Sequence, residues 1–559
     1  MSGQGDGGRD IDWAPLAALV GDRLLEVGDP LAACRIDPLG SACHAALSDH
    51  RNPFAVEEHP GGFHTTGWHG AFDDRTARNA VAAESSDDVA AAVDFARATG
   101  VRLAVKGTGH DYLGRSGAPG ALLIWTHRMR QTTVHESFVA AGTPTGPDGQ
   151  APAGVPALSV AAGTRWLEAY RALEGSGRLA SGGGCSTVGA AGGFTLGGGY
   201  SSFARCFGTA AGNVLEMEVV TADGAVRVVN EHRDPDLFWA LRGGGGGTFG
   251  VVTRITYATH PALRTLGGVM GTIRAGHDRA YRALVEAVVD RMPALATGHW
   301  GEQVRFRPDR SVEVTMTYAD LPDDAARAVW QPLFDWAARR HGDYAADVFV
   351  GSGPYEGYWD ATRWLEQFPD AIRLDRRPNR RHSGDFWWTS HENDVAQFVD
   401  SYQSRWLPLD VVRDRPTEAA EALYRASLCQ EFGIHINKGL AGAAPDALAR
   451  DRTTSVNPAV FDALGLVICA SLQRFAHPGV PGHEPHAAAA EAGARAVAEA
   501  MAVIRSVSPG SGSYVNESDF FEDDWQLSYW GDRYPRLAEI KRRYDPGNLF
   551  TVHHGVGSD

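Results

Sequence analysis

The chain has 559 residues, a formal net charge of −16 and 66 glycines, a glycine share well above the roughly 7% that is usual. The negative charge disfavours a nucleic acid or an anionic membrane as a partner, because binding to phosphates needs clustered Lys and Arg. No apolar run is long enough to cross a bilayer, and charged residues interrupt the N-terminal stretch where a signal peptide needs an apolar core. These features predict a cytoplasmic protein without a disulfide scaffold, and export by a twin-arginine or non-standard route stays open as an alternative.

The first 262 residues alternate short strand patterns with short helix patterns. Ser86 is expected to cap a helix that ends at Gly100, and Thr164 to cap a helix that ends at Gly175. Residues 142–156 are rich in Pro and Gly and predict a surface loop. Strands are predicted at 79–84, 101–105, 122–125, 158–162 and 251–257.

Residues 215–229 contain two alternating apolar patterns around Asp223-Gly224, which predicts a β-hairpin. Asp234-Pro235 then opens a short helix that Gly243 closes. After about residue 262 glycine thins and the helix patterns lengthen, so we place a domain boundary there. Helices are predicted near 277–292, 322–341 and 485–505, and strands at 312–318 and 464–474.

Three glycine-rich segments carry the chemical signals. In VKGTGHDYLGRS (105–116), successive N–H groups can form an anion nest beside His110. In the second segment (182–199), Cys185 lies among small residues that leave its thiol accessible. The third (236–253) contains G-x-G-x-x-G, but it follows a helix and opens a strand, which excludes the nicotinamide-binding fingerprint. Taken singly, a plain glycine turn and a small buried cysteine explain the first two segments better than a reactive site does.

Taken together and in order, these motifs resemble a known family. GTGHDYLGRS, GGGCSTVGAAGG, DLFWALRGGGGGTFGVV, YVNESDF and KRRYDPGNLF are similar to FAD-linked oxidases of the vanillyl-alcohol oxidase / p-cresol methylhydroxylase superfamily, in its berberine bridge enzyme-like branch. The resemblance runs from about residue 52 to the end, and the segments 435–443 and 550–558 look most like isoamyl alcohol oxidase-like members.

The resemblance implies an α+β fold. Residues 1–262, with a core at about 75–262, would form a two-subdomain FAD-binding domain of the p-cresol methylhydroxylase type. Residues 263–506 would form an α+β substrate-binding domain with an antiparallel sheet, and 507–559 would return to the FAD-binding domain. In the substrate domain, Trp359, Trp364, Trp387 and Trp388 are expected to form an aromatic wall, or to lie in the core.

The resemblance also implies bicovalent FAD. His110 matches the histidine that bonds the flavin 8α-methyl group, and Cys185 matches the cysteine that bonds flavin C6. Val188 matches a position where valine accompanies oxidase behaviour, which favours dioxygen as electron acceptor. The other flavin-binding positions carried over are Gly107, Thr108, Gly109, Asp111, Ser116, Thr187, Gly189, Gly192, Gly250, Val252 and Asn516. No metal site is expected.

Three residues are candidates for catalysis. Tyr514 matches a family tyrosine that acts as base, although Glu517 replaces the second aromatic residue of that motif. A phenol with a pKa of ~10 needs a neighbouring charge for this role, and the alternative is a hydrogen-bonded core tyrosine. His435 and Asn437 are expected to share one face of a strand, lying over the flavin or facing solvent.

The expected activity is that of an FAD-dependent oxidase. It would remove hydride from an alcohol, a sugar or an intermediate of secondary metabolism and pass the electrons to dioxygen, giving hydrogen peroxide. An oxidative cyclase on the same scaffold and a non-catalytic flavin-binding protein stay open as alternatives. The oligomeric state stays open too, as does the state of Cys34 and Cys43, which resemble a pair that is bridged in secreted relatives.

Overall fold

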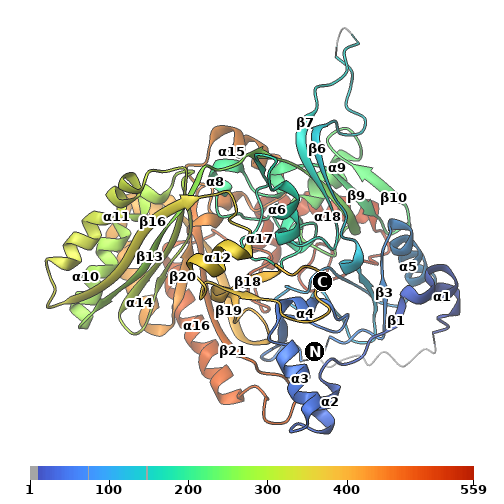
Figure 1. Cartoon of the computed structure of the whole chain (residues 1–559), viewed down its shortest axis with the longest axis horizontal. Helices are drawn as coiled ribbons and strands as arrows, with labels where there is room; N and C mark the ends of the chain where they lie inside the picture. The colour runs from blue at the N-terminus through green and yellow to red at the C-terminus, as the bar shows by residue number, and fades with distance from the viewer. Residues whose placement is uncertain (1–10, 74, 147–148, 559) are drawn as a thin grey trace.

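In the described residues, the glycine-rich half of the chain forms two larger sheets (Figure 1) and a small two-stranded one. The structure, a computed structural model, describes residues 11–73, 75–146 and 149–558. The first sheet has the order β1-β3-β5-β4, in which β3, β5 and β4 are parallel and β1 is an antiparallel edge. Its strands are β1 (Leu24–Glu26), β3 (Asn79–Ala82), β4 (Leu103–Lys106) and β5 (Leu122–Trp125).

The second sheet of this half is antiparallel, with the order β10-β9-β11-β7-β6. The predicted hairpin around Asp223-Gly224 is confirmed, and Gly224 has the positive φ of 79° that such a turn requires. Its strands are β6 (Thr132–Phe138), β7 (Val155–Ala161), β9 (Val214–Val220), β10 (Val226–Val229) and β11 (Val251–Ala258).

An eight-stranded sheet makes up most of the second half, with the order β16-β13-β15-β14-β20-β21-β19-β2. All adjacent strands of this sheet are antiparallel except the pair β19 and β2. The predicted α+β class with an antiparallel sheet is therefore confirmed. Its strands are β2 (Thr65–Trp68), β13 (Thr265–Ala275), β14 (Trp300–Phe306), β15 (Ser311–Ala319), β16 (Tyr344–Pro354), β19 (Gln397–Pro408), β20 (Phe432–His435) and β21 (Ala463–Arg474).

Long helices cover the outer face of this sheet (Figure 1). They are α10 (Asp278–Val289), α11 (Asp323–Ala338), α14 (Pro416–Cys429) and α16 (Ala487–Val507), and all three predicted helices of this half are among them. Val269, Val304, Val314 and Val467 from the strands are fully buried or nearly so against these helices. This apolar packing leaves the opposite face of the same strands free to line a cavity.

Two predicted helix starts are wrong by one residue. The cap of α5 (Ser86–Thr99) is Ser85, whose hydroxyl accepts the Asp88 N–H at 3.2 Å while the Asp88 carboxylate accepts the Ser85 N–H. The reciprocal pair satisfies two free N–H groups, whereas Ser86 satisfies none. The cap of α6 (Trp166–Leu173) is Arg165 rather than Thr164.

The predicted domain boundary near 262 falls between β12 (His260–Pro261) and the first long strand of the eight-stranded sheet. The sheet also takes in β2, from residues 65–68, so it is not made from 263–506 alone. The three-part division stays a prediction, and its residues 1–10 lie outside the described part of the chain. Residues 147 and 148 of the predicted loop 142–156 also lie outside it.

The C-terminal segment is tied to the glycine-rich segments by buried hydrogen bonds. In α18 (Tyr534–Tyr544), the Lys541 ammonium donates to the carbonyl of Thr248 at 2.7 Å. In α17 (Trp525–Trp530), the Trp530 indole donates to the carbonyl of Gly243 at 3.0 Å. These bonds hold residues 513–557 against the first half of the chain.

The remaining elements are short. They are α1 (Ala14–Val20), α2 (Ala32–Ile36), α3 (Ser41–Asp49), α4 (Pro53–Glu57), α7 (Gly193–Leu196), α8 (Ala204–Phe207), α9 (Pro235–Leu241), α12 (Ala361–Gln367), α13 (Leu409–Asp414), α15 (Pro445–Arg452), β8 (Arg178–Leu179), β17 (Ile372–Leu374) and β18 (Phe386–Trp388). A disulfide between Cys34 and Cys43 joins α2 to α3. Among the described residues, no helix has the length and apolar character that a membrane span needs.

Candidate active site

A cavity of about 1360 Å³ lies between the glycine-rich segments and the sheet. One wall consists of residues from 105–116, 179–203 and 246–252, and the other of side chains from β13, β14, β15, β20 and β21. Pockets for a single small ligand usually measure roughly 300–1,000 Å³. The cavity therefore has room for a large cofactor together with a substrate.

A buried lysine fixes the turn that carries His110. Lys106 is fully buried at the end of β4, and its ammonium donates to the carbonyls of His59, Pro60 and Gly62 at 2.7, 2.9 and 2.6 Å. Three acceptors satisfy all three N–H groups of the ammonium, which compensates for its burial. Gly109 follows with φ of 84°, a conformation that glycine adopts without strain.

His110 is held as a neutral imidazole at the cavity wall. Its ring stacks on His64 with centroids 3.6 Å apart, and its Nε2 lies 2.9 Å from the Thr187 hydroxyl. Burial, together with the charge of His391, lowers the pKa of His110 to about 3. A neutral ring keeps a nitrogen lone pair available near pH 7, which bond formation to a carbon atom requires.

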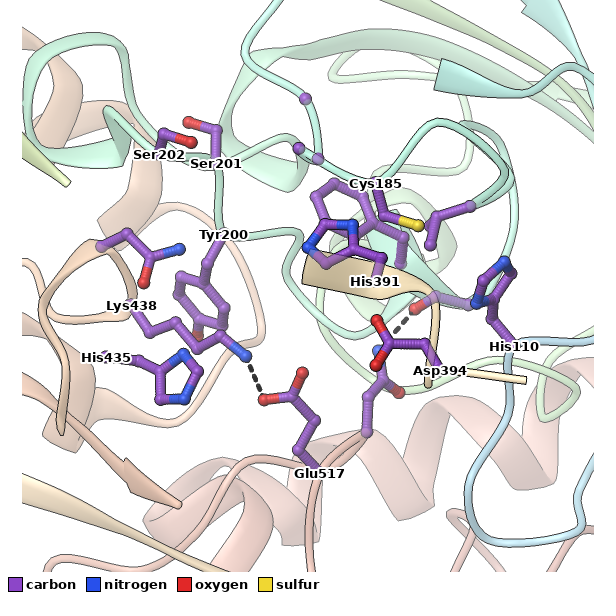
Figure 2. Close-up of a pocket in the computed structure, with 18 of the residues that line it drawn as sticks. His110, Cys185, Tyr200, Ser201, Ser202, His391, Asp394, His435, Lys438 and Glu517 are labelled. Carbon is purple, nitrogen blue, oxygen red and sulfur yellow. Dashed lines mark hydrogen bonds and ion pairs between the residues drawn. The ribbon is translucent and has the colours of Figure 1, made fainter. Parts of the chain in front are cut away.

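Cys185 lies on a loop that two aromatic side chains pin in place. The Tyr170 hydroxyl donates to the carbonyl of Gly183 at 2.8 Å, and the Trp388 indole donates to that of Gly184 at 3.0 Å. Cys185 is a free, half-buried thiol on the cavity wall. Figure 2 shows Cys185, His110 and His391 around the same part of the cavity.

The glycine-rich wall fits a dinucleotide. A methyl group added at Gly192 or Gly193 would meet no atom within 4 Å, so the bare backbone borders open space there. Backbone without side chains lets N–H groups approach a diphosphate closely. Arg115 also lines the cavity, and its Nη2 is buried without a partner among the described residues. These observations fit the FAD that the sequence predicts.

Asp111 holds its own turn. Its carboxylate accepts the backbone N–H groups of Leu113 at 3.3 Å and Ser116 at 3.1 Å, and also that of Arg115. The predicted contact of Asp111 with the diphosphate stays a prediction. The other predicted flavin-binding positions on the cavity wall are Gly107, Thr108, Gly109, Ser116, Val188, Gly189, Gly192, Gly250, Val252 and Asn516. Thr187, 1% exposed, lies just behind them.

Tyr514 borders the cavity from the C-terminal segment. Its phenol oxygen accepts the Asn516 amide at 3.0 Å. Burial and the carboxylate of Glu517 raise the pKa of Tyr514, and the hydrogen bond from Asn516 offsets part of this rise. Glu517 itself forms an ion pair with Lys438 (Figure 2). The Lys438 ammonium lies 5.7 Å from the Tyr514 ring centre. The role of Tyr514 as a base stays a prediction.

His435 and Asn437 do not share a strand face as predicted. β20 ends at His435, and residues 436–438 form a single turn of 3₁₀ helix. Both side chains nevertheless line the cavity. Burial, with the charges of Lys438 and Arg305, lowers the pKa of His435 well below its usual range, so this ring is neutral. Their catalytic roles stay predictions.

The sheet wall holds polar groups that sequence reasoning missed. Gln303, Thr315 and Thr317 each present a buried side-chain oxygen that has no partner among the described residues, as does the predicted site residue Asn437 in the turn after β20. Thr315 and Thr317 alternate along β15 with valine and methionine that face the helices, and this period of two was the available signal. Buried polar groups without partners are rare and indicate a ligand that satisfies them.

Three of the four predicted tryptophans border the cavity: Trp359, Trp364 and Trp388. Trp387 instead packs in a small apolar cluster with Phe54. His391 and Asp394, which follow β18, also line the cavity and were not predicted. No motif marks them, because their proximity to Cys185 arises only from the folded chain.

Comparison with known proteins gives the family. The profile described as "FAD binding domain" matches residues 77–230, and that described as "Berberine and berberine like" matches 513–557. The FAD-linked oxidoreductase ZEB1 of Gibberella zeae is 30% identical over 483 residues, which cover 86% of this chain and 76% of that protein.

Solved structures share the fold. The crystal structure of the VAO-type flavoprotein MtVAO615 from Myceliophthora thermophila C1 matches with a TM-score of 0.77 and 26% identity, covering 99% of this chain and 96% of that one. Glucooligosaccharide oxidase from Acremonium strictum, described with a 6-S-cysteinyl, 8α-N1-histidyl FAD, matches with a TM-score of 0.63 and 20% identity, covering 86% and 91%. The chain belongs to the FAD-linked oxidoreductases of the berberine bridge enzyme-like branch of the vanillyl-alcohol oxidase superfamily.

Proposed function

We propose that this protein is an oxidase that carries FAD on His110 and Cys185 and oxidises a hydroxylated small molecule with dioxygen. One observation carries the proposal: a single cavity has a neutral histidine and a free thiol on its glycine-rich wall and unpartnered polar groups on its sheet wall. FAD, when bound, accepts the hydride. Two covalent links would fix its ring and make it a stronger oxidant.

His110 and Cys185 would bond the flavin through different groups, an imidazole and a thiol. The low pKa of His110 leaves its imidazole neutral and nucleophilic, and the Thr187 hydroxyl at 2.9 Å orients the ring. Cys185 is free and reaches the same part of the cavity (Figure 2). The oligosaccharide oxidase of Acremonium strictum is described with this pair of linkages, and this chain has a histidine and a free cysteine on one cavity wall.

The sheet wall supports a substrate with several hydroxyl groups. The unpartnered oxygens of Gln303, Thr315 and Thr317 can each bond a substrate hydroxyl. Trp359 and Trp388 add flat apolar surfaces on the same cavity, on which a ring can stack. An alcohol or sugar group carried on a ring fits this wall better than a small aliphatic alcohol, which would leave most of these groups unpaired.

Tyr514 is the residue to which we assign the substrate proton. Its oxygen accepts the Asn516 amide, which favours the phenolate, while burial and Glu517 favour the phenol. Its phenolate would take the proton from the substrate hydroxyl. Val188, on the glycine-rich wall, is assigned to the path by which dioxygen reaches the reduced cofactor.

A search for peroxide release tests the function. The purified protein is mixed anaerobically with alcohols, sugars and polyketides, and bleaching of the flavin absorbance is followed before air is admitted. We expect at least one compound to bleach the flavin and then to give one hydrogen peroxide per product. Bleaching without rapid reoxidation by air would instead mean a dehydrogenase, and no bleaching by any compound would favour the non-catalytic alternative. The structure of the product separates carbonyl formation from ring closure.

A further inference from the structure

His391 faces Cys185 across the cavity. Cys185 lies on the glycine-rich wall, whereas His391 lies in the turn after β18, on a segment that reaches over from the second half of the chain (Figure 2). The indole of Trp388, three residues before His391, donates to the carbonyl of Gly184, next to Cys185, at 3.0 Å. This bond fixes the distance between the two segments close to both side chains.

Buried ion pairs hold the β17–β18 hairpin that leads to His391. Asp385 is 1% exposed, and it pairs with Arg171 and, at 3.6 Å, with Arg165, both of which belong to the first half of the chain. Arg377, at the other side of the hairpin, pairs with Glu58 at 2.9 Å. The hairpin is therefore anchored to the FAD-binding half, and the turn that carries His391 is anchored with it.

The charges around His391 favour its protonated form. The groups that face it are Cys185, Asp394, Glu302 and His110. Burial lowers the pKa of His391, but a hydrogen bond and charge interaction with Cys185, and the charges of Asp394 and Glu302, outweigh burial and raise that pKa to about 9. Its Nδ1 is buried with no partner among the described residues. The ring is thus a base that has Cys185 as a proton donor.

The other nearby bases are poorly suited to Cys185. His110 has a pKa of about 3 and is itself assigned to a bond with the flavin. Burial and the neighbouring His110 and Lys106 lower the pKa of His64 well below its usual range, and its ring stacks on His110. Neither histidine holds a proton near pH 7 as His391 does.

We propose that His391 takes the proton of Cys185 and thereby generates the thiolate that bonds the flavin at C6. The inference rests on the bicovalent attachment proposed above. The thiol proton moves to His391, the S–C6 bond forms, and the C6–H bond breaks with loss of its proton. The two electrons of that bond pass to dioxygen, which leaves with both protons as hydrogen peroxide. No other oxidant is needed.

A His110→Ala background isolates this step, because Cys185 is then the single attachment point. The full chain with His110→Ala, alone or with His391→Gln, is incubated with FAD in air, and the Cys185 peptide that carries flavin is quantified by mass over time. Ser390→Ala serves as the matched control, since Ser390 is the exposed neighbour of His391.

The pH profile gives the decisive result. With His391 present, the rate of flavin attachment to Cys185 should be nearly flat between about pH 6 and pH 8. The proton moves from Cys185 to His391, so the number of protons on the pair does not change. With His391→Gln the rate should fall roughly tenfold or more near pH 7 and rise by up to about tenfold per pH unit, because solvent hydroxide must then remove the thiol proton. Ser390→Ala should behave like the background.

Three outcomes overturn the inference. Equal rates and profiles with and without His391 would show that Cys185 needs no base. If His391→Gln loses its fold, the His110→Ala variant alone decides. A tenfold rise per pH unit in its rate of flavin attachment would show that His391 does not take the Cys185 proton. If no Cys185 peptide carries flavin at any pH although FAD binds, the bicovalent attachment itself fails, and this inference fails with it.

Discussion

At the scale of single residues, burial determines which groups can react. Lys106 is buried with three carbonyl partners and only supports the turn, whereas His110 is half-buried beside a hydroxyl and stays neutral. Tyr514 is buried beside Glu517, which opposes its ionisation. The same physical effect therefore prepares one residue as a nucleophile and limits another as a base.

Val188→Leu tests the path of dioxygen. Val188 is half-buried on the glycine-rich wall of the cavity. One additional methylene at this position narrows the approach to the cofactor without touching the sheet wall. We expect flavin reoxidation by dioxygen to slow, with anaerobic reduction by substrate nearly unchanged, in stopped-flow measurements. An equal loss of rate in both half-reactions would mean that Val188 serves only in packing and not in the access of dioxygen.

Tyr514→Phe tests the base. The substitution removes one hydroxyl and keeps the ring, so we expect flavin reduction to slow by roughly 10²–10⁴-fold with little change in melting temperature. In the parent, burial and Glu517 raise the pKa of Tyr514. The phenolate fraction therefore increases throughout the alkaline range, and the rate of reduction should rise with pH without a plateau below about pH 10. Reduction within about threefold of the parent would place the base elsewhere, and His435 and Asn437 would be tested next.

At the scale of elements, local sequence predicts turns and caps well and predicts distant contacts poorly. The hairpin at Asp223-Gly224 and the helix opened by Asp234-Pro235 are confirmed, because the conformation of a turn is encoded by the residues within it. The strand pattern at 435–437 is wrong, since β20 ends at His435, opposite Gln303, and the next residue of β14, Glu302, has a positive φ of 64° that interrupts regular pairing. His391 was not predictable, because its neighbour Cys185 lies about two hundred residues away.

Gly193→Val tests the glycine-rich wall as a cofactor cradle. A Cβ atom at Gly193 would meet no protein atom within 4 Å, so we expect the substitution to leave the fold intact. It would occupy the space that we assign to FAD, so we expect flavin content to fall sharply while the circular dichroism spectrum is kept. Gly342→Ala is the matched control, since Gly342 also borders open space but lies outside the cavity. Unchanged flavin content in Gly193→Val would place the cofactor elsewhere.

Asp385→Asn tests the anchoring of the β17–β18 hairpin. The change leaves the buried Arg165 and the half-buried Arg171 without the carboxylate that they share, and breaking such a pair typically costs about 3–5 kcal/mol. Thermal unfolding should show a clear loss of stability. Asp309→Asn, in an exposed pair with Arg274, should leave the melting temperature unchanged. Equal effects of the two changes would contradict the anchoring role.

At the scale of the whole molecule, the site is formed where two halves of different construction meet. Glycine-rich turns give one wall, and their positions could be read from the sequence because glycine marks close backbone approaches. The other wall comes from strands between residues 265 and 474, whose cavity-facing residues such as Thr315 are ordinary strand residues until the sheet is assembled. The family resemblance therefore predicted the cofactor better than it predicted the substrate wall.

The attachment of the flavin tests the central proposal most directly. The purified protein is denatured in acid, and the flavin that stays with the polypeptide is measured by absorbance and by the mass of the His110 and Cys185 peptides. We expect all of the flavin to stay in the parent, one link to remain in His110→Ala and in Cys185→Ala, and none in the double variant. Complete release of flavin from the unmutated protein would contradict bicovalent attachment.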